Sequence, residues 1–197
     1  FTPGSTYRIT GTNKRPPENE SELLFFGEGA SVVLDGASGF LEFNDTADYQ
    51  NFRYFTVRGL DLDATLRSAT AGFYFIGAYN AFGNFYPKRG NVEYITIEDV
   101  SVHGAPAVVG GTCVAIGLGC KQGAVREATT NYVRHITIDN VRIEGGDTGI
   151  LVMTELSVAG VPPRDQWPAD VNQVCDDIDI SNVHFDSGKV PPFLTVQ

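Results

Sequence analysis

The nonapeptide Tyr94-Ile95-Thr96-Ile97-Glu98-Asp99-Val100-Ser101-Val102 decides the fold, because four versions of it occur in the chain. The other three begin at Tyr54, His135 and Asp177, which gives offsets of 40, 41 and 42 residues between successive copies. Weaker copies lie upstream at 32–36 and 7–11. A period of this kind is typical of proteins in which equivalent segments stack on one another. We therefore predict six stacked rungs.

Apolar and polar residues alternate within each copy, as they do in half-buried strands. One position breaks the alternation, and it holds Gly59, Asp99, Asn140 or Asn182. Because Gly, Asn and Asp tolerate a left-handed backbone best, each copy is expected to form two short strands joined by a bend with positive φ. The apolar positions predict a continuous core column of Phe55, Val57, Leu60, Leu62, Ile95, Ile97, Val100, Val102, Ile136, Ile138, Val141 and Ile143.

A third strand is expected after each copy, where apolar residues lie two positions apart, as in Ile150 and Val152. Each strand aligns with one in the next repeat rather than with a hairpin partner, which argues against a β-sandwich or an up-and-down barrel. The predicted fold is all-β, a right-handed parallel β-helix of about six coils with long loops on one side. Residues 1–197 are expected to form a single domain. Because Phe1 is not a start methionine, we expect a processed chain or a piece of a longer one.

The charge balance narrows the range of partners. The chain has 197 residues, with 14 Lys and Arg against 24 Asp and Glu, a formal net charge of -10. This charge repels phosphate backbones and anionic lipids, so we expect no nucleic-acid and no membrane partner. No apolar run approaches the roughly 18 residues of a membrane helix. Cys113, Cys120 and Cys175 allow at most one internal disulfide, and their disulfide state stays open.

The opening residues 1–9, with 27–30 and 32–36 after them, are similar to the first coils of pectate-lyase-3-type proteins. Together with the repeats, they make the chain resemble the pectin-lyase-like superfamily of right-handed parallel β-helices. That group includes phage tailspikes and secreted polysaccharide-degrading enzymes, so the resemblance implies an extracellular or virion-associated protein. The resemblance does not carry a set of catalytic residues over to this chain. Asp176-Asp177 opens a core strand, and His103-Gly104 lacks the preceding glycine of the family-28 glycoside hydrolases.

Candidate binding residues lie in or near the long segments that follow the third strands. The segment 79–89 holds four aromatic rings followed by two cations, which suits stacking on sugars and pairing with carboxylates or sulfates. The alternative is that the rings cover a neighbouring strand and that the cations pair with interleaved acids. Trp167 is either a sugar platform or the anchor of its own loop. The predicted substrate-binding residues are Tyr79, Phe85, Tyr86, Lys88, Arg89, Lys121, Arg126, Arg164 and Trp167.

Candidate catalytic groups are the carboxylates Glu127, Glu155 and Asp165 on the same side of the stack. Hydrolysis needs two carboxylates about 5 to 9.5 Å apart, whereas a lyase needs a base and a cation on the uronate carboxylate. We predict a carbohydrate-directed protein that binds a polysaccharide, with cleavage by a lyase or glycoside hydrolase left open. No cofactor is required, no metal site is predicted, and Ca²⁺ is optional.

The alternative hypothesis is a non-catalytic structural or adhesin module, such as a segment of a phage tail fibre or tailspike. A homotrimer or larger assembly stays open under either hypothesis. The glycan itself is not specified by the sequence. A panel of uronic-acid and neutral polysaccharides separates the two hypotheses, because only the enzyme would turn one of them over.

Overall fold

The computed structural model describes residues 1–10, 22–36, 39–42, 49–67, 72–79, 89–105, 113–122, 130–146, 148–156, 172–186 and 194–196. Within these ranges the chain forms strands and turns, and no helix long and apolar enough to cross a membrane is present. The strands are β1 (Thr6–Ile9), β2 (Leu23–Leu34), β3 (Leu41–Glu42), β4 (Tyr49–Asp63), β5 (Gly72–Tyr79), β6 (Arg89–Ala105), β7 (Cys113–Gln122), β8 (Thr130–Gly145), β9 (Thr148–Leu156), β10 (Asn172–Asp186) and β11 (Leu194–Val196).

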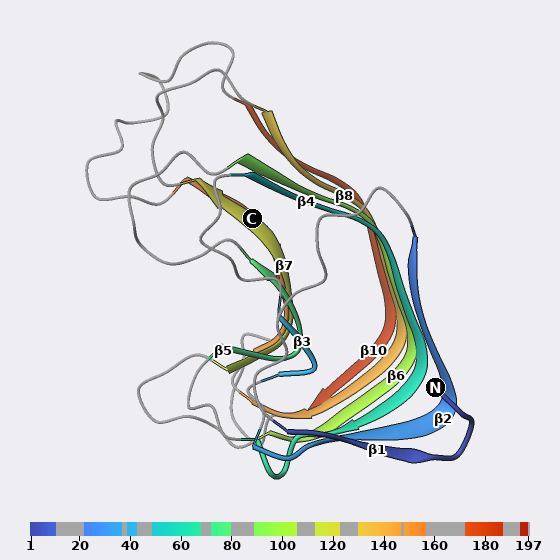
Figure 1. Cartoon of the computed structure of the whole chain (residues 1–197). Helices are drawn as coiled ribbons and strands as arrows, with labels where there is room; N and C mark the ends of the chain where they lie inside the picture. The colour runs from blue at the N-terminus through green and yellow to red at the C-terminus, as the bar shows by residue number, and fades with distance from the viewer. Residues whose placement is uncertain are drawn as a thin grey trace.

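The strands form two sheets that face each other (Figure 1). One sheet has six strands in the order β1-β2-β4-β6-β8-β10, and the other has five in the order β11-β9-β7-β5-β3. Neighbouring strands in both sheets are parallel. From β2 onward the chain therefore passes alternately from the six-stranded sheet to the five-stranded sheet. The predicted all-β class with parallel pairing between repeats is confirmed.

The register of the six-stranded sheet follows the sequence repeat. Thr56 of β4 lies beside Thr96 of β6, which in turn lies beside Thr137 of β8. The two weaker copies belong to the same stack, because Tyr7 pairs with Val32 and Val32 pairs with Leu62. Equivalent side chains of successive repeats are thus held about 4.8 Å apart, which is the ordinary spacing of neighbouring strands.

The core lies between the two sheets. All the residues of the predicted core column are buried, and they form one cluster with residues of the five-stranded sheet such as Ile116 and Ile150. At roughly 2 kcal/mol for each fully buried aliphatic side chain, this column is a main source of stability. Burial of these side chains fixes which face of each strand points inward, and therefore which side chains lie on the outer face.

Each long strand of the six-stranded sheet bends where φ becomes positive. The predicted corner residues Gly59, Asp99, Asn140 and Asn182 have φ values of 70°, 53°, 50° and 51°, which confirms the prediction. Glycine is required at the first of them, because a Cβ there would lie 2.8 Å from the backbone nitrogen of Glu28. We call this corner the downstream bend, and it comprises residues 58–59, 98–99, 139–140 and 181–182.

A second bend, which the sequence analysis did not predict, lies five residues before the first. Tyr54, Tyr94, His135 and Asp177 have φ values of 58°, 59°, 56° and 50°. Bulky side chains are uncommon in this region of backbone space. We call this corner the upstream bend, and it comprises residues 53–54, 93–94, 134–135 and 176–177.

Candidate functional site

The upstream bend places two consecutive side chains outside the core. In β6, Val92 and Ile95 are both buried in the core cluster, so Glu93 and Tyr94 between them lie on the outer side. The positive φ at Tyr94 causes this, because it interrupts the two-residue alternation of the strand, while the register with the neighbouring strands stays unchanged. The neighbouring strands repeat the arrangement in register. Two columns of side chains therefore cross the strands: a ring column of Tyr54, Tyr94 and His135, and a charged column of Arg53, Glu93, Arg134 and Asp176.

The ring column is a continuous stack on the surface. The ring centroids of Tyr54 and Tyr94 are 5.0 Å apart with an interplanar angle of 11°, and those of Tyr94 and His135 are 4.5 Å apart at 14°. The two tyrosines are 40% and 42% exposed. Since the faces of Tyr94 are occupied by its neighbours, the column presents ring edges and phenol hydroxyls to a ligand.

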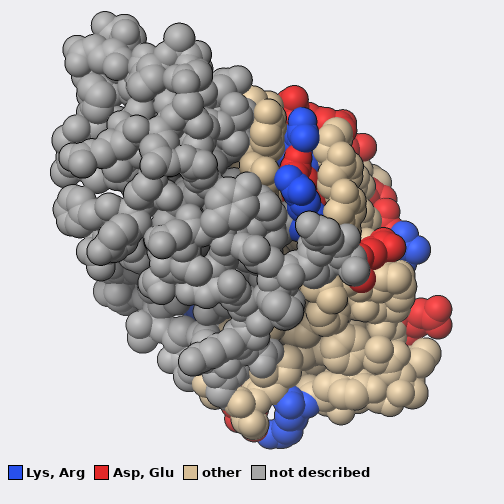
Figure 2. Space-filling view, turned by 45° about the horizontal axis from the view of Figure 1, so that its top comes forward, with Lys and Arg blue, Asp and Glu red and all other residues tan. Residues whose placement is uncertain are grey.

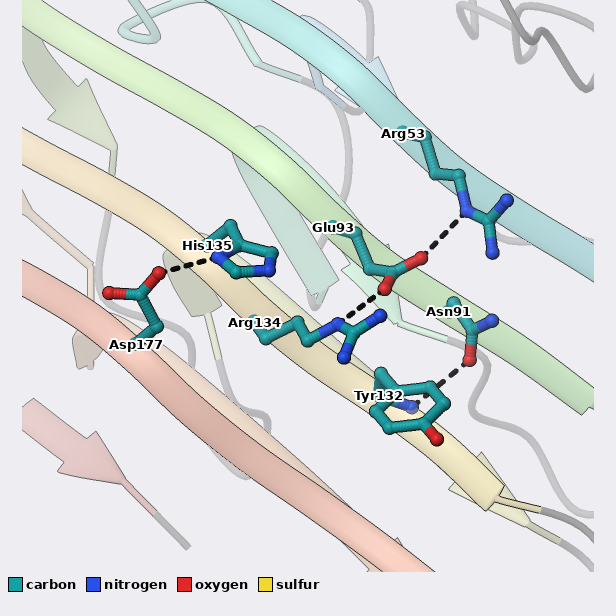
Figure 3. A network of polar contacts seen from close by, with 7 residues as sticks. All are labelled: Arg53, Asn91, Glu93, Tyr132, Arg134, His135 and Asp177. Atoms are coloured by element: carbon teal, nitrogen blue, oxygen red, sulfur yellow. Dashed lines mark hydrogen bonds and ion pairs between the residues drawn. The ribbon is translucent and has the colours of Figure 1, made fainter.

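His135, the last ring of the column, contacts the carboxylate of Asp177. His135 Nδ1 lies 2.5 Å from Asp177 Oδ2, and in Figure 3 the second ring nitrogen points away from Asp177. In the neutral tautomer that carries its proton on Nδ1, toward the carboxylate, Nε2 is a hydrogen-bond acceptor. The pair can therefore accept a hydrogen bond from a hydroxyl group at the end of the column.

The charged column is centred on a buried carboxylate. Arg134 Nε donates a hydrogen bond of 2.6 Å to Glu93 Oε1, and Arg53 Nε lies 2.7 Å from Glu93 Oε2 as an ion pair without hydrogen-bond alignment. Glu93 is only 1% exposed. Figure 3 shows the two arginines reaching it from β4 and β8 on either side. The hydrogen bond with Glu93 raises the pKa of Arg134, so its guanidinium stays charged.

Polar and aromatic contacts extend the charged column toward the starts of the strands. The Arg134 guanidinium lies 4.2 Å from the centroid of the Tyr132 ring, a cation–π contact. The backbone N–H of Tyr132 donates to Asn91 Oδ1 at 3.0 Å. This segment continues to Arg89, which begins β6 beside Tyr49 of β4.

The local charge of the upstream bend is close to neutral with a small excess of acid. Its two arginines stand against the three carboxylates Glu93, Asp176 and Asp177. In Figure 2, blue and red atoms follow one another in a narrow stripe with tan side chains on both sides. The arrangement therefore offers alternating donors and acceptors rather than a cationic patch.

The downstream bend has a different chemistry, although it has the same geometry. Asn140 Nδ2 donates to Asp99 Oδ1 at 2.7 Å, and both Ser181 Oγ and Asn182 Nδ2 donate to Asp139 Oδ1 at 2.8 Å. These hydrogen bonds lower the pKa of Asp139. The side chains at this bend satisfy one another between rungs, and they carry no aromatic ring.

The predicted site residues lie mostly outside the described part of the chain. This holds for Phe85, Tyr86, Lys88, Arg126, Glu127, Arg164, Asp165 and Trp167. For the other four, the structure gives the backbone position only. Tyr79 ends β5, Arg89 begins β6, and Lys121 of β7 is the register partner of Glu155 of β9. The binding and catalytic roles of all twelve stay predictions.

The sequence does contain a signal for the upstream bend. Two polar or aromatic residues stand between two apolar ones in Val92-Glu93-Tyr94-Ile95, as they do around the downstream bend in Ile97-Glu98-Asp99-Val100. The identities obscured this signal, because tyrosine, which stands at two of the four positions, is not a residue expected at positive φ. An apolar spacing of three, repeated in register, is the pattern that would have revealed both bends.

The described ranges offer few groups for metal binding or thiol chemistry. No group of three or more His, Cys, Asp or Glu side chains is placed there to hold a metal ion. Cys175 carries a free thiol, and its partial burial raises its pKa, so it is a poor nucleophile at neutral pH. Hydrogen bonding and stacking are therefore the chemistry that the outer face offers.

No protein-family model matches this chain, and no curated protein or solved structure matches it either. The fold and the geometry of the upstream bend are thus what bears on function. Together they describe a rigid face on which rings, hydroxyls, guanidinium groups and carboxylates recur at intervals of one strand.

Proposed function

We propose that this protein binds a polysaccharide along the ring column and the charged column of the upstream bend. We also propose that its two sheets are walls of a right-handed parallel β-helix of about six coils. The alternation of the chain between two parallel sheets supports the coil, since a β-helix requires that order of strands. The resemblance noted in the sequence supports the class of ligand and an extracellular or virion-associated location.

The observation that carries the proposal is the presence of bulky rings where the backbone is left-handed. Each such residue costs about 1 to 3 kcal/mol, and residues of this kind cluster at functional sites. Stacking returns about 0.5 to 1.5 kcal/mol for each ring pair, and because the three rings form two pairs, it offsets only part of the summed cost of the column. The downstream bend makes the same corner with Gly59, Asp99 and Asn140. We therefore propose that these rings are retained because they contact a ligand.

The spacing of the columns suits a linear polymer. Equivalent groups on successive rungs are separated by one strand spacing, and the measured ring-to-ring distances are 5.0 and 4.5 Å. A chain of sugar units lying across the strands meets a similar set of groups at each rung. Tyrosine hydroxyls and arginine N–H groups donate hydrogen bonds, and Asp177 accepts them.

Cleavage of the bound polymer is a further part of the proposal. The carboxylates Glu127, Glu155 and Asp165 are the proposed catalytic candidates, in a lyase or a glycoside hydrolase. In the sequence, Glu127 lies between β7 and β8 and Asp165 lies between β9 and β10, while Glu155 of β9 is the register partner of Lys121.

A structural or adhesin module is the second candidate, and the state of the last rung favours it. Ile178, Ile180, Val183 and Phe185 of β10 are only partly buried, whereas Ile136, Ile138, Val141 and Ile143 of β8 are fully buried. Half-covered apolar side chains are suited to being covered by another strand, which can belong to the same protein or to a second copy. This candidate predicts a stable oligomer that retains no polysaccharide.

Affinity gel electrophoresis against a panel of neutral and acidic polysaccharides tests the proposal. Retardation by at least one polymer is expected, and it should weaken in Tyr94→Ala while Arg142→Ala, at the far end of β8, leaves it unchanged. Reducing ends and unsaturated sugar products, measured on the same mixtures, test cleavage. An oligomer that binds none of the panel would support the structural module instead.

A further inference from the structure

We infer that the polymer bound at the upstream bend is a neutral polysaccharide rather than a polyuronate, an inference that rests on the binding function proposed above. The site differs in this respect from the predicted loop cations, which suit an acidic glycan. The charges of the described face decide between the two classes of ligand.

The arginines of the described face are already paired with carboxylates. At the upstream bend, Arg53 and Arg134 both contact Glu93, at 2.7 and 2.6 Å. The other N–H groups of both arginines can donate to a ligand, but the positive charge of the pair is already partly neutralised by the buried Glu93, so the pair attracts a uronate carboxylate less strongly than two unpaired arginines would. The same pairing recurs elsewhere on the outer face, in Arg8 with Asp35, Arg58 with Glu98, and Arg142 with Glu144.

The field around the site also disfavours a polyanion. Asp176 is the last member of the charged column and Asp177 follows it in the chain, so that carboxylates outnumber arginines at this bend. The whole chain has a net charge of -10. At low salt this field reaches beyond about 10 Å, and it acts on every uronate of a bound segment. Repulsion of this kind lowers the association rate and the affinity together.

A neutral polymer avoids both penalties and can use the same groups. Sugar hydroxyls donate to Asp177 and accept from the tyrosine hydroxyls and from the guanidinium N–H groups that do not point at Glu93. Apolar C–H surfaces of the sugar pack against the ring edges of Tyr54 and Tyr94. Neither kind of contact requires a charge on the ligand.

Matched polymer pairs that differ only in charge provide the test. The probes are hydroxyethyl cellulose against carboxymethyl cellulose, and fully methyl-esterified against de-esterified polygalacturonan, with dissociation constants measured at low and at high salt. The neutral member is expected to bind about tenfold more tightly at low salt, and the difference should shrink as salt screens the repulsion. Tighter binding of the charged members would overturn the inference while leaving polysaccharide binding intact. Absence of binding to any polymer of the wider panel would overturn the proposed function itself.

A substitution that removes a charge at the upstream bend tests whether the preference for neutral polymers arises there. Glu93→Gln removes the carboxylate between the two arginines, so its relative affinity for carboxymethyl cellulose should rise several-fold over the wild type. Glu98→Gln at the downstream bend changes the net charge equally and is the matched control. Circular dichroism confirms that both variants fold. Equal shifts in the two variants would show that the polymer does not lie on the upstream bend, and would overturn the inference.

Discussion

The upstream and downstream bends perform the same geometric task with different residues. Both interrupt the alternation of a long strand, and both turn two consecutive side chains out of the core. The downstream bend does so with Gly, Asp and Asn, which adopt positive φ at little cost, whereas the upstream bend does so with two tyrosines, a histidine and an aspartate. Since Gly, Asp and Asn are the residues that this backbone favours, the turn alone does not explain Tyr54 and Tyr94, and the proposed binding role accounts for them.

The two bends also differ in how their charges are buried. Glu93 is enclosed between two arginines at the upstream bend, while Glu98 at the downstream bend pairs with the more exposed Arg58. A buried carboxylate shared by two cations depends on its partners far more than a surface ion pair does.

The largest effect is therefore expected from Glu93→Ala. Removing the carboxylate leaves Arg53 and Arg134 facing each other without a counter-charge. Because each arginine side chain is 34% exposed, the expected loss of unfolding free energy is roughly 2 to 3 kcal/mol, below that of a fully buried pair. Glu98→Ala is the matched control and should cost less than about 1 kcal/mol. Urea denaturation measures both, and equal losses would contradict the difference between the bends.

A backbone substitution at the downstream bend should have the next largest effect. Asn140→Val forces a β-branched residue to a φ of 50°, so we expect a loss of about 1 to 3 kcal/mol. Asn140→Gly removes only the hydrogen bond to Asp99 and should cost less. Thermal unfolding of the two variants checks the assignment, and an unchanged melting temperature for Asn140→Val would contradict the corner.

The corresponding change at the upstream bend should be nearly neutral for stability. Tyr94→Gly relieves a backbone strain of about 1 to 3 kcal/mol while it removes two stacking contacts of about 0.5 to 1.5 kcal/mol each. The two terms offset each other, so the unfolding free energy should change by less than about 1.5 kcal/mol. A much larger loss in urea denaturation would show that the ring column serves stability.

The smallest expected effect is that of acid on the hydrogen bonds that link β8 and β10 at the downstream bend. Hydrogen bonds from Ser181 and Asn182 lower the pKa of Asp139 below its value in the unfolded chain. The stabilisation is therefore fully present above about pH 4 and is lost as the pH falls through the folded-state pKa. Asp139→Asn should unfold with a shallower pH dependence between about pH 5 and pH 2 than the wild type. If the unfolding free energies of Asp139→Asn and the wild type depended on pH in the same way, this role of Asp139 would be contradicted.

Much of the fold could be predicted from the sequence, because the core repeat is strict. Alternating apolar residues and a recurring Gly, Asp or Asn gave the parallel stack, the register and the downstream bend. The upstream bend escaped prediction because propensity argues against Tyr54 and Tyr94 at positive φ. The site was therefore expected in the long loops, where functional residues usually concentrate, rather than on the strands.

The predicted loop residues and the ring column are not exclusive. Arg89 begins the strand that carries Glu93 and Tyr94, so a polymer on the upstream bend passes near the ends of the long segments. Binding on the strands and chemistry in the loops would then be two parts of one face.

One measurement tests most directly whether the upstream rings serve binding. The dissociation constant of a neutral polysaccharide retained by the wild type is compared in Tyr94→Gly and Asn140→Gly, which place the same residue at the two equivalent corners. Binding at least about tenfold weaker in Tyr94→Gly, with Asn140→Gly close to the wild type, is the predicted result. Equal affinities in the two variants would contradict it.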